Sequence, residues 1–144
     1  MSAEANMALV RQWVEQVWNQ GNMELLTHFH PPIFDNHGHP SSIHETQEWH
    51  LRTRTTFPDI HYTIDDIFAT DDRVALRWTA TATHRGALWQ IPPTGKRITW
   101  TGMHLLRLAH NQIVEVWALQ NGVAQLQQMG LTLNTATDAA AKES

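Results

Sequence analysis

His104, Glu115 and Asn121 are the polar residues whose types and spacing could do chemistry together. They lie in one short stretch of the chain that also carries Trp100 and Trp117. An imidazole exchanges protons close to neutral pH, and a nearby carboxylate can orient it and favour its charged form. An amide does not ionise near neutral pH, but its N–H can hold a substrate oxygen that gains negative charge. The sequence therefore predicts acid–base chemistry in which His104 transfers the proton, Glu115 assists it and Asn121 binds the substrate oxygen.

The element expected to position these residues is a β-hairpin with its turn at His110-Asn111. Both arms are rich in β-branched and aromatic residues, which favours paired strands. A two-residue turn pairs His104 with Trp117 and Trp100 with Asn121, and alternation along each strand then puts these side chains on one face. Large rings with one imidazole and one amide match the composition of a ligand pocket. A packed core sheet with two satisfied polar residues matches it equally well.

Trp78, Trp100, Trp117 and His84 are further candidates for substrate binding. The three tryptophans could form the apolar walls of a pocket, or they could belong to the core. His84 precedes Gly86, where we expect a bulge, and bulges often redirect a side chain into a site.

The composition limits the classes of protein to consider. With 144 residues, 42% of them hydrophobic, the chain fits one domain, which we place at residues 1–131. A net charge of -4 favours neither nucleic acid nor an anionic membrane surface as a partner. Because the chain has no cysteine, disulfides, thiolate metal sites and cysteine nucleophiles are excluded. No leader-like segment and no long apolar run is present, so we expect a cytoplasmic protein.

Tryptophan and histidine are unusually frequent, with seven and ten residues. Many tryptophans on a small sheet suggest an aromatic hollow or a large interface. The histidines show no HExxH spacing. His28, His30, His37 and His39 lie beside prolines and are interpreted as solvated loop residues. We therefore expect no metal site, with metal binding by these loops as the alternative.

The hydrophobic periodicity changes once along the chain. Helical spacing predicts helices over residues 3–19, 23–29, 42–56 and 123–129, the third starting with the capping box Ser42–Glu45. Residues 34–40 are expected to be an irregular polar connection. Period-two alternation predicts strands over residues 61–69, 73–84 with a continuation at 88–91, 97–108 and 112–121. The tail, residues 132–144, has no apolar periodicity and is predicted to be disordered.

Helices followed by strands indicate an α+β domain. We expect three N-terminal helices packed on a curved, mostly antiparallel sheet of four to six strands. A long, twisted and bulged sheet covered on one face curls into a cone-shaped barrel, and the mouth of that cone is the natural ligand site.

A family resemblance is carried by five motifs in this order: Phe57–Asp59, Asp72–Thr79, Thr83–Gly86, Ile91–Arg97 and Ile113–Trp117. Together they resemble the SnoaL-like polyketide cyclase or ester cyclase family, within the nuclear-transport-factor-like cone fold, over about residues 5–130. The resemblance implies a homodimer formed through the outer sheet face, a small hydrophobic ligand and no cofactor. It also implies a polar residue at the mouth of the cone, for which His37 is the candidate.

Members of this family close a ring by an intramolecular aldol step, in which a carboxylate moves the proton. In the family pattern this acid–base residue is an Asp four residues after the Trp of Glu-x-Trp, and here that position is Asn121. The sequence is therefore compatible with two main functions. One is a cyclase or isomerase that transfers a proton through another residue, and the other is a non-catalytic small-molecule-binding protein of the same fold. A protein-interaction domain is the third alternative, because the fold hosts all three classes.

Overall fold

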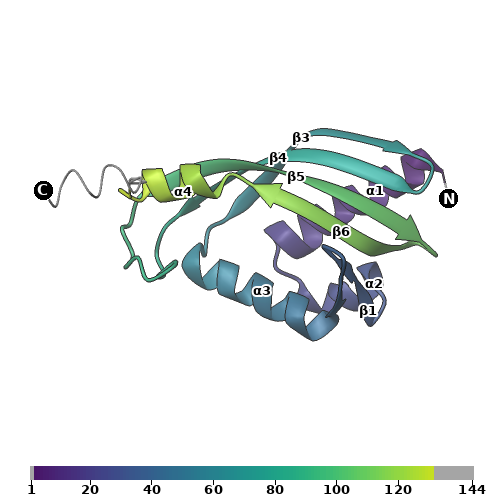
Figure 1. Ribbon diagram of the computed structural model, residues 1–144, viewed down its shortest axis with the longest axis horizontal. Helices are drawn as coiled ribbons and strands as arrows, with labels where there is room; N and C mark the ends of the chain where they lie inside the picture. The colour runs from purple at the N-terminus through teal and green to yellow at the C-terminus, as the bar shows by residue number, and fades with distance from the viewer. Residues whose placement is uncertain (1, 132–144) are drawn as a thin grey trace, which may run out of the picture.

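The helices of the computed structural model, which describes residues 2–131, follow the predicted order (Figure 1). Helix α1 (Ala3–Trp13) continues directly into a π-helical segment, η1 (Val14–Asn19). A 3-10 turn, η2 (Met23–Leu25), leads into α2 (Leu26–Phe29). Helices α3 (Ile43–Thr56) and α4 (Gly122–Gln128) complete the set. The predicted capping box is present in part, since the Ser42 hydroxyl accepts the Glu45 backbone N–H at 3.1 Å.

Six strands form one sheet in the order β2-β1-β6-β5-β4-β3. They are β1 (Ile33–Asn36), β2 (His39–Ser42), β3 (His61–Thr70), β4 (Arg73–Thr83), β5 (Arg97–Ala109) and β6 (Gln112–Gln120). Strand β1 runs parallel to β6, and the other neighbours are antiparallel. The short β1–β2 hairpin occupies residues 34–40, where an irregular connection was predicted. The prediction missed these strands because the segment is polar.

The helices α1, α2 and α3 cover one face of the curved sheet and leave the opposite face of β3–β6 open (Figure 1). This arrangement confirms the predicted α+β cone. The core lies under α1 and η1, where Val10, Val14 and Val17 pack against the inward-facing residues of β4 and β5. The alternation predicted for β4 is confirmed, since Val74, Leu76, Trp78, Ala80 and Ala82 are all buried.

The predicted register of the β5–β6 hairpin is wrong by one residue over most of its length. The two-residue turn is confirmed, with left-handed φ angles of 52° at His110 and 60° at Asn111. A β-bulge then separates the Leu108–Ile113 pair from the Arg107–Glu115 pair. The extra residue on β6 shifts every later pair, so that side chains beyond it move to the opposite face. His104 therefore pairs with Ala118 and not with Trp117.

One other predicted strand segment is not formed. Residues 88–91 do not continue β4, because Leu88 pairs with Ile91 across a tight turn in which Trp89 and Gln90 have positive φ angles. The tail predicted to be disordered, residues 132–144, lies outside the described residues. Within residues 2–131, no helix is long and apolar enough to cross a membrane.

Candidate functional site

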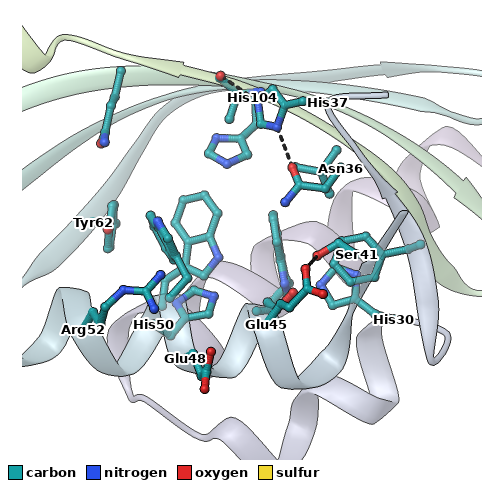
Figure 2. A pocket seen from close by; sticks show the side chains of 18 of the residues that line it. His30, Asn36, His37, Ser41, Glu45, Glu48, His50, Arg52, Tyr62 and His104 are labelled. Carbon is teal, nitrogen blue, oxygen red and sulfur yellow. Dashed lines mark hydrogen bonds between the residues drawn. The ribbon is translucent and has the colours of Figure 1, made fainter. Parts of the chain in front are cut away.

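A cavity of about 540 Å³ lies between α3 and the inner face of the sheet (Figure 2). Its apolar lining consists mainly of aromatic rings from the helices and from β1, β3 and β4: Trp13, Trp18, Phe34, Trp49, Tyr62 and Trp78. The curved sheet arches over α3, and the hollow lies between the two (Figure 1). Most of the walls are apolar, so each polar atom that reaches the cavity has a strong effect on what can bind there.

His104 lies on the inner face of β5 and projects into this cavity (Figure 2). Its Nδ1 accepts a hydrogen bond of 2.9 Å from the indole N–H of Trp78, and the Trp18 ring lies 4.7 Å from the imidazole centroid. Burial lowers the pKa of His104 to about 3, and the neighbouring His37 and His50 add to this effect. The imidazole is therefore neutral near pH 7. Since Nδ1 is the acceptor, Nε2 carries the proton and can only donate.

Gly102 makes the Trp78–His104 pair geometrically possible. It faces Trp78 across the β4–β5 ladder, and a Cβ atom added at Gly102 would lie 2.2 Å from Cζ2 of the indole. Any side chain at position 102 would take the space in which the indole lies flat against β5. The indole could then not reach the Nδ1 of His104, two residues along the strand. The glycine thus fixes the position of the tryptophan, and the tryptophan fixes the tautomer of the histidine.

Two further histidines, which the sequence analysis did not select, line the same cavity. His30 was interpreted as a solvated loop residue, but it is buried, with its ring stacked 4.2 Å from that of Phe34. Its Nδ1 donates to the Ile113 carbonyl at 3.0 Å, and burial lowers its pKa to about 4. His50 on α3 is also buried, and its pKa is lowered to about 4 by burial first, and then by His30 and Arg54.

The spacing on α3 contains a signal that could have identified His50. Ile43, Thr46, His50 and Arg54 recur at helical spacing and form the face that α3 turns toward the sheet. A helix with only one large apolar residue on that face cannot seal a core. The polar residue at its centre therefore faces a hollow.

The rim of the cavity is polar. His37 lies in the β1–β2 turn with a φ angle of 57°, and its Nε2 accepts the Ala118 backbone N–H at 2.9 Å while Nδ1 bonds the Asn36 side chain. Glu45 and Glu48 line the rim from α3, where Glu48 is 3.0 Å from His44. Within residues 2–131, no cluster of histidine or carboxylate side chains is suitable for holding a metal ion.

The model of the SnoaL-like polyketide cyclase family matches residues 8–129, which is most of the chain. The chain belongs to this family. The family resemblance and the cone fold predicted from the sequence are both confirmed. A comparison with curated proteins finds no significant match.

Three solved structures show the same fold at modest sequence identity. AclR of Streptomyces galilaeus, described provisionally as a hydroxylase, is 28% identical with a TM-score of 0.80, over 99% of this chain and 92% of AclR. IdmH of Streptomyces antibioticus, described provisionally as a polyketide cyclase, is 27% identical with a TM-score of 0.78, over 88% of this chain and 99% of IdmH. A protein of Acidithiobacillus ferrooxidans with the same provisional description is 25% identical with a TM-score of 0.79, over 90% of this chain and 97% of that one.

Of the residues predicted to act in catalysis in this SnoaL-like chain, only His104 reaches the cavity. Asn121 lies one residue beyond β6, where its side-chain oxygen caps α4 by accepting the Ala124 N–H at 3.0 Å. Glu115 lies on the outer face of the sheet, hydrogen-bonded to Arg107 at 2.8 Å and to the Trp117 indole at 2.9 Å. The bulge places the Glu115 side chain on that face. Asn121 is not paired with β5, because it lies beyond the end of β6.

The five residues predicted to bind substrate are also divided. Trp78 and His37 line the cavity. Trp100 is buried in the core with its indole N–H donating to Gln120 at 3.1 Å, and Trp117 is on the outer face and 42% exposed. His84 is fully buried away from the cavity and accepts the Thr94 N–H at 3.3 Å.

Proposed function

We propose that the protein binds a small hydrophobic, oxygenated substrate and catalyses its cyclisation or isomerisation by proton transfer between its own side chains and the substrate. The observation that carries this proposal is the Trp78–His104 hydrogen bond, which leaves a neutral imidazole N–H available in an aromatic cavity. The cavity volume of about 540 Å³ falls in the range that small-molecule sites occupy. A substrate of two or three fused rings fits both the volume and the aromatic walls.

His104 acts in this proposal as a hydrogen-bond donor to a substrate carbonyl oxygen. When a proton leaves the neighbouring carbon, negative charge develops on that oxygen, and a fixed donor in a dry site stabilises it without reorganisation. A neutral histidine suits this role because its hydrogen bond strengthens as the oxygen becomes an anion. The role differs from the sequence prediction of His104 as the proton-transfer group. Nε2 already holds a proton, and Nδ1 is bound to Trp78.

A specific observation favours the alternative, a binding protein without turnover. The residues of β6 that line the cavity are Val116, Ala118, Leu119 and Gln120, and none of them is a carboxylate. The family acid–base residue therefore has no counterpart on this strand. If no other side chain moves a proton, the cavity serves only to hold a ligand.

The experiment that tests catalysis uses as probes two ketones that carry C–H bonds next to the carbonyl, the bicyclic 1-tetralone and the tricyclic 1-oxo-1,2,3,4-tetrahydrophenanthrene. Binding is followed by quenching of tryptophan fluorescence. Proton transfer is followed by ¹H NMR as the loss of the proton next to the carbonyl in D₂O. We expect binding of at least one probe and protein-catalysed exchange. His104→Phe keeps the ring but removes the donor, so it should slow exchange by ~10²–10³-fold. Binding without exchange supports the ligand-binding alternative, and failure to bind either probe contradicts both functions.

A homodimer is the assembly that the outer sheet face supports. This face exposes a group of large apolar side chains on neighbouring strands: Met103, Leu105, Trp117 and Leu119. Apolar side chains that cluster on an open sheet gain free energy when a second surface covers them. We propose that a second copy of the chain covers this patch, as the family resemblance implies.

A further inference from the structure

We propose that His50 is the residue that takes the proton from the substrate, on the wall of the cavity opposite the donor His104. This inference rests on the proposed function, because it assigns the base for the same reaction. It moves the proton-accepting role from the sheet, where the sequence pattern of the family puts it, to helix α3.

The position of His50 is suited to that role. It lies in the middle of α3 on the face turned toward the sheet, and its side chain lines the cavity. Figure 2 shows His50 on α3 and His104 on the sheet, and both side chains line the cavity. A ketone seated between the two walls would present its oxygen to one imidazole and its adjacent C–H to the other.

His50 also has a free lone pair. Among residues 2–131 it makes no side-chain hydrogen bond, so a nitrogen is available to accept a proton. Burial, His30 and the Arg54 guanidinium hold its pKa near 4, and the imidazole is neutral near pH 7. Arg54 is fixed beside it, since its Nη1 donates to the Trp18 carbonyl at 3.1 Å. His104 lies opposite and is itself neutral. His50 is therefore unprotonated before a substrate arrives.

The other ionisable groups of the cavity are less suited. The Nδ1 of His30 is committed to the Ile113 carbonyl, and its Nε2 is fully buried. Burial raises the pKa of the Tyr62 hydroxyl well above its usual range, so that group stays protonated. Glu45 and Glu48 are exposed rim residues, the first 3.4 Å from the Ser41 hydroxyl and the second paired with His44. His37 uses both ring nitrogens at the rim.

The proposed step is balanced within the substrate and the two histidines. The C–H bond next to the carbonyl breaks, its electron pair forms the enolate, and the proton moves to the unprotonated nitrogen of His50. The His104 N–H donates to the enolate oxygen. In a cyclisation, the enolate carbon attacks a second carbonyl carbon of the same substrate and forms the new C–C bond. The alkoxide then takes the proton back from His50, so the protein ends unchanged.

The test compares His50→Gln and His50→Ala with His44→Gln, a matched control on the exposed side of the same helix. The probes are 1-tetralone and 1-oxo-1,2,3,4-tetrahydrophenanthrene, with binding measured by fluorescence and exchange by NMR as above. We expect both His50 variants to bind the probe within ~3-fold of the parent protein, and to lose exchange by ~10²–10⁴-fold. His44→Gln should exchange at the parent rate. Added imidazole should restore exchange in His50→Ala, because the free base enters the space that the side chain left.

The outcomes separate this inference from the proposed function. If the parent protein exchanges the probe, His104→Phe does not, and His50→Gln still does, the proposed function holds and His50 is not the base. If the parent protein binds the probes without exchanging them, or binds neither, both proposals are overturned. If His50→Ala is folded by circular dichroism and loses exchange, but imidazole fails to restore it, the loss does not come from a missing base and the inference is wrong.

Discussion

The two faces of the β5–β6 hairpin carry neighbouring residues in opposite electrostatic environments. On the inner face His104 is surrounded by indole rings, and on the outer face Glu115 bonds Arg107 and Trp117 next to solvent. Both side chains have a lowered pKa. Burial lowers that of His104 and favours its neutral form. Hydrogen bonds from Trp117 and Arg107 lower that of Glu115 and favour its charged form.

This comparison shows why the direction of a pKa shift does not by itself identify a functional group. The shift of Glu115 arises from partners that satisfy the carboxylate, so little chemistry remains for it. The shift of His104 arises from removal of water, which leaves a polar N–H that only a ligand can satisfy. Folding therefore leaves an unsatisfied polar N–H on the inner face, which costs free energy, and stabilises a charged carboxylate on the outer face.

The largest expected effect is loss of stability in acid, caused by the inner face. His30, His50 and His104 have folded-state pKa values of about 4, 4 and 3, below the unfolded value of 6.5. The unfolded chain binds more protons below pH 6.5, so stability is fully present above that pH and falls as the pH decreases toward 4. With three such groups the free energy of unfolding should fall by up to about 4 kcal/mol per pH unit. Urea denaturation at pH 7, 6 and 5 measures this slope.

The His104→Phe variant measures how much one of the three histidines contributes to the dependence of the unfolding free energy on pH. It removes one of the three groups, so the slope between pH 6 and 5 should decrease by about a third. A slope that does not change would mean that His104 is hydrated in the folded protein, and the contrast between the two faces would be lost.

Gly102→Ala should produce the next largest effect. A Cβ atom there would overlap the Trp78 indole, which must shift away from β5 and break its bond to His104. Overpacking of this kind costs about 1–3 kcal/mol of unfolding free energy, and exchange on the ketone probes should fall together with it. The exposed Gly95 has open space around it, but its φ angle of 70° makes it a poor control. Ala80→Gly, which removes a buried methyl group on the same face, is a better one because it leaves Trp78 and His104 in place.

The sequence predicted the elements, the fold and the family because these depend on periodicity and turn chemistry. The alternation in β4, the capping residue Ser42 and the turn at His110-Asn111 each leave a local signal, and each was confirmed. Many such signals agree with one another along the chain, so one weak element does not change the fold.

The composition of the site was predicted less well because it depends on one residue of register. The extra residue in β6 moved Trp117 and Glu115 to the outer face, and nothing in the local sequence of that strand identifies a bulge. His30 and His50 were missed for another reason. A histidine beside a proline, as His30 is, has the same sequence context whether it is solvated or buried, and only tertiary packing decides between the two states. For His50, the thin apolar face of α3 was a signal for a cavity or for water, and the sequence did not decide between them.

A change in assembly is expected from Met103→Lys on the outer face. Met103 is 59% exposed in one chain and is not among the residues that line the cavity, so the substitution should leave the fold and the ketone exchange unchanged. Burial of a methionine side chain contributes about 1.5–3 kcal/mol and a symmetric dimer loses two of them, so the dissociation constant of the dimer should rise by at least ~100-fold. Sedimentation equilibrium of the parent and variant proteins measures it. A parent protein that is monomeric at micromolar concentration would contradict the dimer.

The smallest effect is expected from Glu115→Gln, although the sequence pattern gave this residue a part in catalysis. Arg107 and Trp117 donate to different carboxylate oxygens, so the amide oxygen can keep one of the two hydrogen bonds, and the other is lost together with the charge. An ion pair next to solvent contributes about 0–1 kcal/mol, and salt screens it, so the change in unfolding free energy should shrink further at high salt. The rate of ketone exchange should not change, because the carboxylate and the cavity lie on opposite faces of the strand. A tenfold loss of exchange with the fold intact would mean that Glu115 reaches the site through the sheet, and the two faces would then have to be treated as one functional unit.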